Sequence, residues 1–296
     1  MHKIVKKRLL ANSIYLMDIE APRVAKSAQP GQFIIIRNDD KGERIPLTVA
    51  DYDKKEGTVT IVFQTVGAGT KELALYEVGD YVSDFVGPLG QPSEFIHENI
   101  EELKNKNIIF IAGGVGTAPV YPQVKWFKEQ GIKVDVIVGA RNKDLLILSD
   151  EMREVAGNLY IATDDGSEGF NGRVTDCLDY LINNEGKSYD HAVIIGPMIM
   201  MKFMALKTKE LGIKTTVSLN PIMVDGTGMC GACRVTVGDK VKFACVDGPE
   251  FDGHLVDFDE SMRRQVLYKT SEGRAVLKFE EGATHKRIGC DCKEEV

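Results

Sequence analysis

Cysteines are the residues of this 296-residue chain whose spacing points most directly to chemistry. Cys230 and Cys233 form a Cys-x-x-Cys pair, and Cys245 follows on an adjoining segment that reads as a small hairpin. Three thiolates on one small scaffold suit an iron–sulfur cluster, which is typically held by four cysteines. Glycines are frequent between residues 226 and 231, so the backbone can wrap closely with amides directed at the sulfurs. The region therefore predicts a metal centre that still needs a fourth ligand.

Zinc is the competing metal, because it also binds four cysteines or a mixture of cysteine and histidine. His254, nine residues after Cys245, is the histidine at a plausible spacing. Five of the six cysteines lie in the last 67 residues, which indicates a local metal site rather than a disulfide framework. Spacing alone favours an iron–sulfur cluster and leaves zinc open.

A glycine-rich turn follows an apolar run at residues 108–112. Gly113, Gly114 and Gly116 come first, and Thr117 then opens a helical stretch. Glycines let a backbone approach a pyrophosphate closely, and the N-terminus of a helix favours its negative charge. The spacing is not Gly-x-Gly-x-x-Gly, so the loop by itself is equally consistent with a plain tight turn.

Polar residues after two later apolar runs bear on the nucleotide. Asp164 and Asp165 follow a run at the position where ribose hydroxyls are often bound, although a solvated turn has the same composition. Arg141 and Lys143 suit a 2′-phosphate but equally suit an exposed surface. The sequence therefore leaves open whether a bound dinucleotide would carry a 2′-phosphate, the group that distinguishes NADP from NAD.

The elements that must position these groups fall into three regions and a tail. Residues 1–98 contain short strands, such as 31–37 and 58–64, and predict an antiparallel β-barrel with a short helix near 69–75. Beyond a charged linker, apolar runs alternate with helical stretches and predict an α/β domain with a parallel sheet. The apolar runs are at 108–112, 134–139, 159–163, 192–196 and 215–219. The expected boundaries are 1–98 for the barrel, 105–220 for the α/β domain, 221–260 for the metal domain and 261–296 for the tail.

Bulk composition limits the class of protein. A hydrophobic content of 43% and a charged content of 27% are ordinary for a globular protein. The formal net charge of −7 argues against a general nucleic-acid binder. No apolar run approaches 18 residues, and the first ten residues lack the apolar core of a signal peptide. We therefore expect a cytoplasmic protein without a membrane span.

Together these segments resemble the ferredoxin reductase superfamily over residues 1 to about 260. The similar branch contains the electron-transfer subunit of dihydroorotate dehydrogenase B and the small subunit of NADH-dependent reduced ferredoxin:NADP⁺ oxidoreductase. The resemblance implies FAD in the barrel, NAD(H) as substrate of the α/β domain, and a 2Fe–2S cluster in the third region.

The resemblance also assigns residues to the cofactors. Those implied for FAD are Arg44, Pro46, Leu47, Thr48, Val62, Phe63, Gln64, Gly69 and Thr70. Those implied for the nucleotide are Gly113, Gly114, Gly116, Thr117, Asp164, Asp165 and Gly196. Arg44 would bind the FAD phosphates, although it stands one residue further from Thr48 than in the family pattern. Ile195 replaces a cysteine that often precedes the Gly-Pro pair at 196–197; the methionines that follow are typical of core packing.

The cluster motif of the family departs from this sequence at one position. The family pattern is Cys-Gly-x-Gly-x-Cys-x-x-Cys followed by a later cysteine, and Asp225 replaces its first cysteine. This aspartate resembles the ferredoxin:NADP⁺ oxidoreductase branch, so our hypothesis is that its carboxylate is the fourth ligand, a harder donor than thiolate. The rival is Cys290 or Cys292 reaching back from the tail. The expected ligands are Asp225, Cys230, Cys233 and Cys245.

The implied function is that of an electron-transfer subunit. A hydride would move between NAD(H) and FAD, and single electrons would pass through the 2Fe–2S cluster to a larger partner subunit with FAD and 4Fe–4S clusters. Ferredoxin and NADP(H) would react through that partner, where flavin-based electron bifurcation would occur. We expect no catalytic acid–base residue, since the cofactors supply the chemistry. The alternatives are a dihydroorotate dehydrogenase B subunit and a zinc-stabilised nucleotide-binding regulatory module. We expect the tail to contact the partner.

Overall fold

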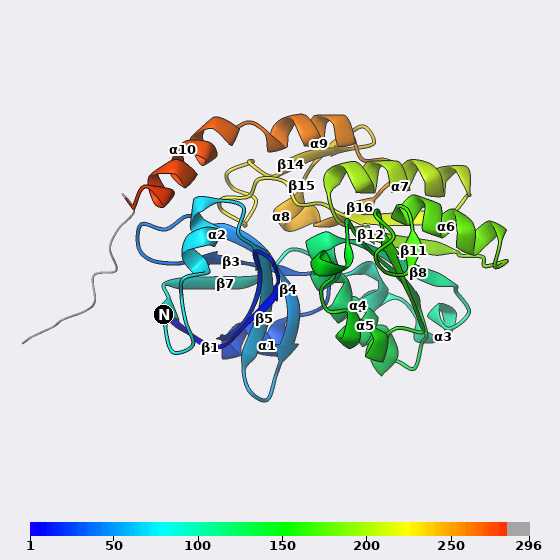
Figure 1. Ribbon diagram of the computed structural model, residues 1–296, viewed down its shortest axis with the longest axis horizontal. Coiled ribbons are helices and arrows are strands. Elements are labelled where there is room, and N and C mark those ends of the chain that lie inside the picture. The colour runs from blue at the N-terminus through cyan, green and yellow to red at the C-terminus, as the bar shows by residue number, and fades with distance from the viewer. Residues whose placement is uncertain (283–296) are drawn as a thin grey trace, which may run out of the picture.

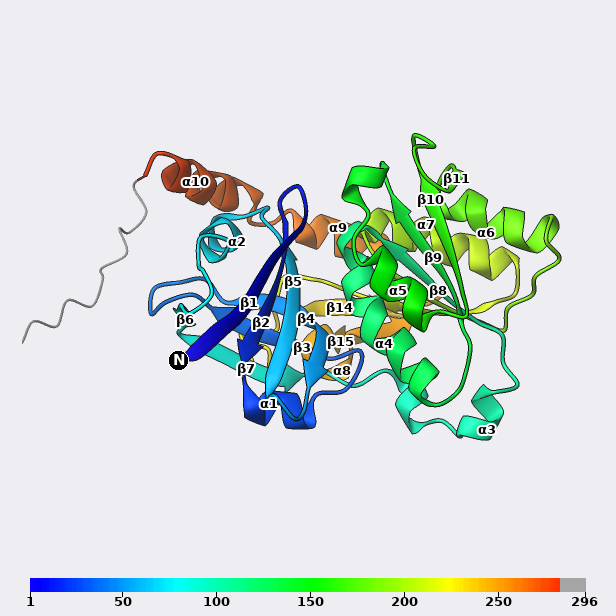
Figure 2. The ribbon, with the colours of Figure 1, turned by 60° about the horizontal axis from the view of Figure 1, so that its bottom comes forward.

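The computed structural model describes residues 1–282 and shows a barrel, an α/β domain and a third region packed against both (Figure 1). Figure 2 shows the barrel and the α/β domain side by side, with the third region behind them. The three-part architecture expected from the sequence is confirmed. The tail cysteines Cys290 and Cys292 lie outside the described residues.

Seven antiparallel strands curl into a nearly closed barrel in the order β6-β1-β2-β5-β4-β3-β7. The strands are β1 (His2–Ala11), β2 (Ile14–Glu20), β3 (Phe33–Arg37), β4 (Ile45–Asp53), β5 (Thr58–Gln64), β6 (Tyr81–Val82) and β7 (Asp84–Leu89). Two short helices, α1 (Pro22–Ser27) and α2 (Ala68–Leu73), accompany them. β-Branched and aromatic residues suit these strands, and Ile34, Ile36 and Phe63 fill the barrel core.

The second sheet has the order β11-β10-β9-β8-β12-β13-β16 and is parallel from β11 to β13. Its strands are β8 (Ile108–Gly113), β9 (Asp135–Ala140), β10 (Asn158–Thr163), β11 (Phe170–Asn171), β12 (His191–Ile195) and β13 (Lys214–Ser218), with the antiparallel edge β16 (Glu250–Asp252). The helices are α3 (Ile100–Leu103), α4 (Thr117–Glu129), α5 (Ser149–Val155), α6 (Val174–Asn183) and α7 (Met198–Glu210), with 3₁₀ turns η1 (Glu94–His97), η2 (Gly114–Gly116) and η3 (Lys143–Leu145).

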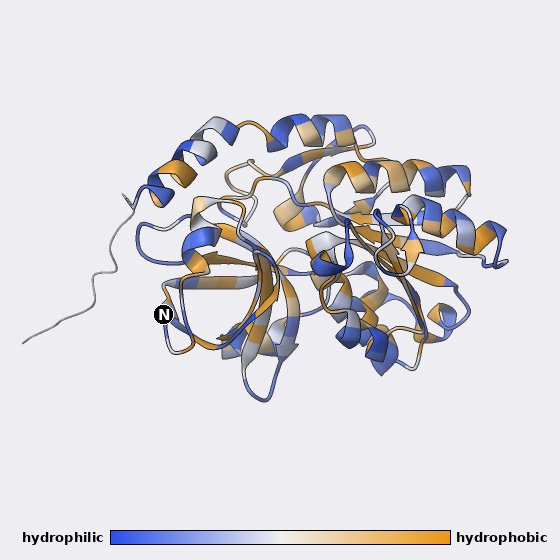
Figure 3. Ribbon diagram, in the orientation of Figure 1, coloured by the Kyte–Doolittle hydropathy of each residue, from blue (hydrophilic) through white to orange (hydrophobic). Residues whose placement is uncertain are grey.

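Helices cover both faces of this sheet, which explains its continuous apolar strands. Ile109 and Ile111 of β8 pack on the side of α6 and α7, while Phe110 packs on the side of α4 and α5. Figure 3 shows hydrophobic residues concentrated in the strands of both domains. Among residues 1–282, no helix combines the length and apolar character required to cross a membrane.

The charged stretch between the two domains is more ordered than its composition indicates. It contains α3, which begins at the N-cap Asn99, whose side chain accepts a hydrogen bond from the Glu101 N–H. Leu103 of this helix is fully buried in the core on the α4 side. One apolar residue at the right place therefore anchors a segment that looks like a linker.

The third region comprises the hairpin of β14 (Arg234–Val237) and β15 (Lys240–Phe243), the short helix α8 (Ala244–Asp247) and β16. Strand β16 pairs with β13, so this region is joined to the nucleotide sheet by backbone hydrogen bonds. The described tail forms α9 (Phe258–Gln265) and α10 (Lys269–Glu280), which arch from α7 toward α2 (Figure 1). Glu280 of α10 forms an ion pair with Lys71 of α2, so the described tail contacts the barrel.

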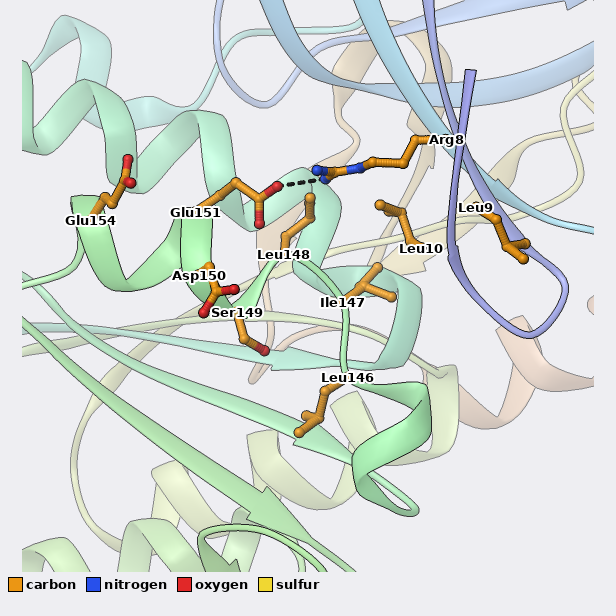
Figure 4. Close-up of a pocket in the computed structure, with 10 residues that line it drawn as sticks. All are labelled: Arg8, Leu9, Leu10, Leu146, Ile147, Leu148, Ser149, Asp150, Glu151 and Glu154. Atoms are coloured by element: carbon orange, nitrogen blue, oxygen red, sulfur yellow. Dashed lines mark hydrogen bonds and ion pairs between the residues drawn. The ribbon is translucent and has the colours of Figure 1, made fainter. Parts of the chain in front are cut away.

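Ion pairs join the barrel to the α/β domain at two places. Arg8 of β1 pairs with Glu151 of α5 at the edge of a hollow of about 570 Å³ (Figure 4). Lys125 of α4 lies 2.8 Å from the carboxylate of Asp51 on β4. Helix α4 also packs against β4, so the Lys125–Asp51 pair adds to an existing contact that sets the mutual orientation of the two domains.

Glu250 places a carboxyl group at the junction of all three parts. Its Oε1 accepts a hydrogen bond of 2.8 Å from the Gln123 side chain on α4, and a Cβ on Gly31 would lie 3.3 Å from the same oxygen. Its Oε2 is buried without a hydrogen-bond partner among residues 1–282. Burial raises the pKa of Glu250 to about 7, with the neighbouring carboxylate of Glu94 adding to the effect and Ser93 and Gln123 opposing it.

Replacing Glu250 by glutamine should make folding stability less dependent on pH. The folded protein keeps a proton on Glu250 that the unfolded chain releases above pH 4.5, so this group costs stability as the pH rises toward 7. Relative to the parent, E250Q should gain about 3 kcal/mol of unfolding free energy between pH 4.5 and pH 8. Urea unfolding followed by circular dichroism at fixed cofactor loading measures this difference.

The exposed carboxyl of Glu281 provides the control, because E281Q should follow the parent at every pH. Parallel stability curves for the parent and E250Q would show that Glu250 does not hold its proton in the folded protein.

Candidate cofactor cleft and cysteine cluster

A cleft of about 540 Å³ opens between the barrel and the carboxyl ends of β8, β12 and β13. Strand β8 continues into η2, whereas the neighbouring β12 continues into Gly196 and Pro197. The crossovers leave the sheet in opposite directions from β8 and β12, and ligands of open α/β sheets bind at such a switch point. The cleft is therefore where the topology places a nucleotide site.

Close packing explains the glycines of this loop. A Cβ on Gly116 would lie 2.3 Å from the carbonyl oxygen of Ile195, and one on Gly113 would lie 2.3 Å from Sδ of Met200. Gly114 has a φ of +55°, in the left-handed region that favours glycine. The loop after β8 can follow this path only without side chains at these positions.

Most of the residues predicted for FAD and nucleotide meet in this one cleft. From the barrel it is lined by Pro46, Leu47, Thr48, Val62, Phe63, Gln64 and Thr70, and from the α/β domain by Gly113, Gly114, Gly116 and Gly196. These segments lie up to 150 residues apart in the sequence. Their convergence supports the predicted cofactor-binding face, while the individual contacts stay predictions.

Five predicted residues do not line the cleft: Arg44, Gly69, Thr117, Asp164 and Asp165. The buried hydroxyl of Thr117 donates to the carbonyl of Gly114 and so braces the loop. The Gly69 carbonyl accepts a hydrogen bond of 2.9 Å from Asn38. Thr70 does line the cleft, and its hydroxyl forms a local cap with Gly67.

The two aspartates lie at the carboxyl end of β10, two strands away from β8. Asp164 and Asp165 are exposed, and a hydrogen bond from the Ser167 side chain holds the pKa of Asp165 below its usual range. The Asp165 N–H donates to the carbonyl of Arg141, and the Lys143 N–H donates to Ser167. Hydrogen bonds therefore join the loops after β9 and β10 into one edge outside the cleft, and the role of the two aspartates toward a nucleotide stays a prediction.

Sequence reasoning missed the far wall of the cleft. This wall consists of Phe33, Ser218, Leu219, Asn220, Pro221, Met223 and Pro249. The segment from Ser218 to Met223 follows a parallel strand, so the rule that ligands bind at carboxyl ends would have indicated it. Phe33 and Pro249 had no such signal, because they reach the cleft only through the packing of separate domains.

Two cysteines of the third region, Cys233 and Cys245, lie at its packed centre. Sγ of Cys233 and Sγ of Cys245 are 3.1 Å apart, too far for a disulfide, and both thiols are buried and free. The backbone N–H of Cys245 donates to Sγ of Cys233 at 3.5 Å. Cys230 is exposed on the loop that precedes them.

Protonation of these thiols follows their surroundings. A hydrogen bond from the backbone N–H of Ala232 lowers the pKa of Cys230, whereas burial raises the pKa of Cys245 to about 12. Backbone amides directed at thiol sulfurs and soft donors on one loop fit the chemistry of an iron–sulfur cluster. Among residues 1–282, no three metal-binding side chains converge on a single ion.

Asp225 begins the same loop with an ionised carboxylate. Its Oδ2 accepts hydrogen bonds from the Thr227 hydroxyl, the Thr227 N–H at 2.9 Å and the Met229 N–H at 3.3 Å. The Thr227 hydroxyl, followed by its N–H, holds the pKa of Asp225 below the usual range. The loop hydrogen bonds engage one carboxylate oxygen and so orient the carboxylate, while its role as a cluster ligand stays a prediction.

The expected histidine partner of a zinc site lies elsewhere. The ring Nε2 of His254 is 3.2 Å from the hydroxyl of Thr208 on α7, and this contact joins a network with Thr215 of β13. His254 therefore ties the third region to the nucleotide domain rather than completing a cysteine site.

Strand β3 connects the cysteines with the cleft. Side chains alternate along a strand, and Ile34 and Ile36 face the barrel core. Phe33 and Ile35 face outward, where they pack in one cluster with Cys233 and Cys245. Phe33 also lines the cleft. One side chain therefore contacts both the cofactor cleft and the packed centre of the cysteine region.

Arg44 of the barrel also contacts the cysteine region, at the start of its loop. Its Nε donates to the carbonyl of Val224 at 2.7 Å, and Nη2 donates to the carbonyl of Asp225 at 3.3 Å. The guanidinium thus holds the start of the cysteine loop, and its predicted role toward FAD phosphates stays a prediction.

Two segments of the chain match known families. Residues 110–205 match the oxidoreductase NAD-binding domain, and residues 220–257 match the iron–sulfur cluster binding domain of dihydroorotate dehydrogenase B. These matches cover the glycine loop and all four expected cluster ligands. They confirm an NAD-binding domain and an iron–sulfur domain.

Similar proteins extend the match to nearly the whole chain. An uncharacterized protein in the adh 3′ region of Clostridium beijerinckii is 73% identical over 99% of each chain. A homolog of the electron transfer subunit of dihydroorotate dehydrogenase B (NAD⁺) from Thermotoga maritima is 49% identical, covering 94% of this chain and 95% of the relative.

Solved structures agree with the fold. A chain from a structure of NADH-dependent reduced ferredoxin-NADP oxidoreductase, a study of flavin-based electron bifurcation, has a TM-score of 0.86 and 47% identity, covering 95% of this chain and 98% of that chain. Phthalate dioxygenase reductase, at 17% identity and a TM-score of 0.55, shares the fold. The chain is therefore an oxidoreductase subunit that belongs to the ferredoxin reductase superfamily, in the family of the electron-transfer subunits of dihydroorotate dehydrogenase B and its homologs.

Proposed function

We propose that this chain is the electron-transfer subunit of a flavin-based bifurcating NADH-dependent ferredoxin:NADP⁺ oxidoreductase. It moves a hydride between NAD(H) and FAD and passes single electrons through a 2Fe–2S cluster to a larger partner subunit. Ferredoxin and NADP(H) react at that partner. The observation that carries the proposal is the sharing of strand β3 between the cleft and the cysteine cluster.

Flavin is the cofactor that supplies the exchange between two-electron and one-electron chemistry. The chain's own residues hold and shape the site. The glycine loop after β8 leaves room for a dinucleotide, and β4 and β5 supply the barrel side of the cleft. Phe33 and Met223 form the wall of the cleft that faces the cysteines. Their apolar side chains exclude water from the space between the cleft and the cysteine cluster.

Asp225 favours the ferredoxin:NADP⁺ oxidoreductase over a dihydroorotate dehydrogenase B subunit. The cluster motif of the dihydroorotate dehydrogenase B subunits has four cysteines, the first of which stands at the position of Asp225. The similarity to the oxidoreductase chain at 47% identity over nearly the full length supports the same choice. Thiolate ligands need a reducing compartment, so the proposal includes a cytoplasmic setting.

The activity of the complex between this chain and its larger partner subunit tests the proposal. Co-purified complex should contain flavin and iron, and NADPH should reduce ferredoxin only when NAD⁺ is present. Reduction of ferredoxin without NAD⁺ would contradict bifurcation. Reduction of NAD⁺ by dihydroorotate would instead assign the dihydroorotate dehydrogenase B function.

Substitution of Asp225 by cysteine should change the cluster. Thiolate is a softer and more electron-donating ligand than carboxylate, so the D225C protein should show a shifted EPR spectrum and midpoint potential. EPR of the dithionite-reduced protein measures the first, and a redox titration measures the second. Spectra identical to those of the parent would remove Asp225 from the ligand set and favour a tail cysteine.

Substitution of Gly116 by alanine should weaken nucleotide binding. A Cβ would lie 2.3 Å from the Ile195 carbonyl oxygen, so the loop has to move away from β12 and into the cleft. We expect about a tenfold higher Kd for NAD⁺, roughly 1.4 kcal/mol, measured by calorimetric titration of the flavin-loaded protein. G273A on α10, where a Cβ meets nothing within 4 Å, is the matched control. A folded G116A protein with the parental Kd would place the nucleotide elsewhere.

A further inference from the structure

Helix α9 follows directly after the part of the chain that matches the iron–sulfur family, which ends at residue 257. It packs against β14 of the third region and against α7. Asp257 caps its N-terminus by accepting a hydrogen bond from the Glu260 N–H, and Lys202 of α7 forms an ion pair with Asp259. The helix is therefore fixed beside the cysteine loop rather than loosely appended.

The last turn of α9 contacts the loop itself. Nη2 of Arg264 donates to the carbonyl of Ala232 at 3.1 Å, between Cys230 and Cys233. Nε of Arg264 is buried and has no hydrogen-bond partner among residues 1–282.

Two arginines thus hold the ends of the loop from different domains. Arg44 of the barrel binds the carbonyls of Val224 and Asp225, and Arg264 of α9 binds the carbonyl of Ala232. An arginine stays protonated at all working pH values, so each contributes a fixed positive charge. A cluster with three thiolates and one carboxylate is anionic, and it gains a further negative charge on reduction.

We infer that Arg264 is a positioning residue for the cluster loop and that its charge stabilises the reduced cluster. The inference rests on the proposed function, in that Asp225, Cys230, Cys233 and Cys245 hold a 2Fe–2S cluster. The guanidinium of Arg264 fixes the peptide between Ala232 and Cys233 and raises the midpoint potential of the cluster through its proximity. The tail helix α9, outside the family domain, therefore sets a property of the metal centre.

Neighbouring arginines on α9 provide a matched test. Arg263 is exposed and carries the same charge one residue away, and it makes none of the loop contacts of Arg264. R264Q should lower the ratio of reduced to oxidised cluster at a fixed potential by about tenfold, which corresponds to 59 mV for a one-electron couple. R263Q should leave the ratio close to that of the parent. The measurement is a redox titration of the full-length, cofactor-loaded protein followed by EPR of the cluster.

The conservative variant R264K separates charge from geometry. It keeps the positive charge but lacks the planar guanidinium, so it should recover most of the potential while losing cluster iron faster than the parent on exposure to a chelator. If R264Q assembles no cluster, parental iron content in R263Q together with a retained potential in R264K supports the inference.

Equal shifts in R264Q and R263Q would overturn the inference, because the effect would then be long-range charge alone. Unchanged potentials and iron retention in both Arg264 variants would overturn it as well. Failure of the proposed function has a different signature, namely a parent protein that contains no 2Fe–2S signal at all.

Discussion

Burial of both faces of strand β3 is the constraint on which the rest of the structure depends. Ile34 and Ile36 belong to the barrel core, while Phe33 and Ile35 pack against Cys233 and Cys245. A strand that is apolar on both faces must be covered on both. The cysteine region covers the outer face of β3. Burial of that face therefore brings the cysteines beside the cofactor cleft.

Several local features serve this one contact. Gly226 has a φ of +84°, and a Cβ there would lie 2.6 Å from Ile35 Cδ1, so the start of the cysteine loop can lie directly on β3. Arg44 holds the same end of the loop, and β16 ties the region to the nucleotide sheet. Gln265 of α9 donates to Asn220 in the cleft wall, which links the tail to the same junction. The cleft and the cysteines therefore form a single packed unit.

The sequence predicted local pattern well and long-range packing poorly. The apolar runs, the glycine loop at 113–116 and the hairpin after Cys233 were all predicted, because each has its own periodicity or turn chemistry. The second face of β3 was not, since the residues that cover it come about 200 positions later. The role of Arg44 toward FAD phosphates stays a prediction, and its hydrogen bonds to the carbonyls of a distant loop were not foreseen. Contacts of this kind depend on how separate domains pack together, and no local sequence pattern predicts that packing.

A single-turnover experiment on the isolated subunit tests the central claim most directly. Anaerobic protein is mixed with one equivalent of NADH and frozen at successive times for EPR, while absorbance follows the flavin. If the cleft and the cysteine cluster are one unit joined through β3, the reduced-cluster signal should rise as the flavin is reduced, without any partner protein. A flavin that becomes reduced while a dithionite-reducible cluster stays oxidised would contradict this view.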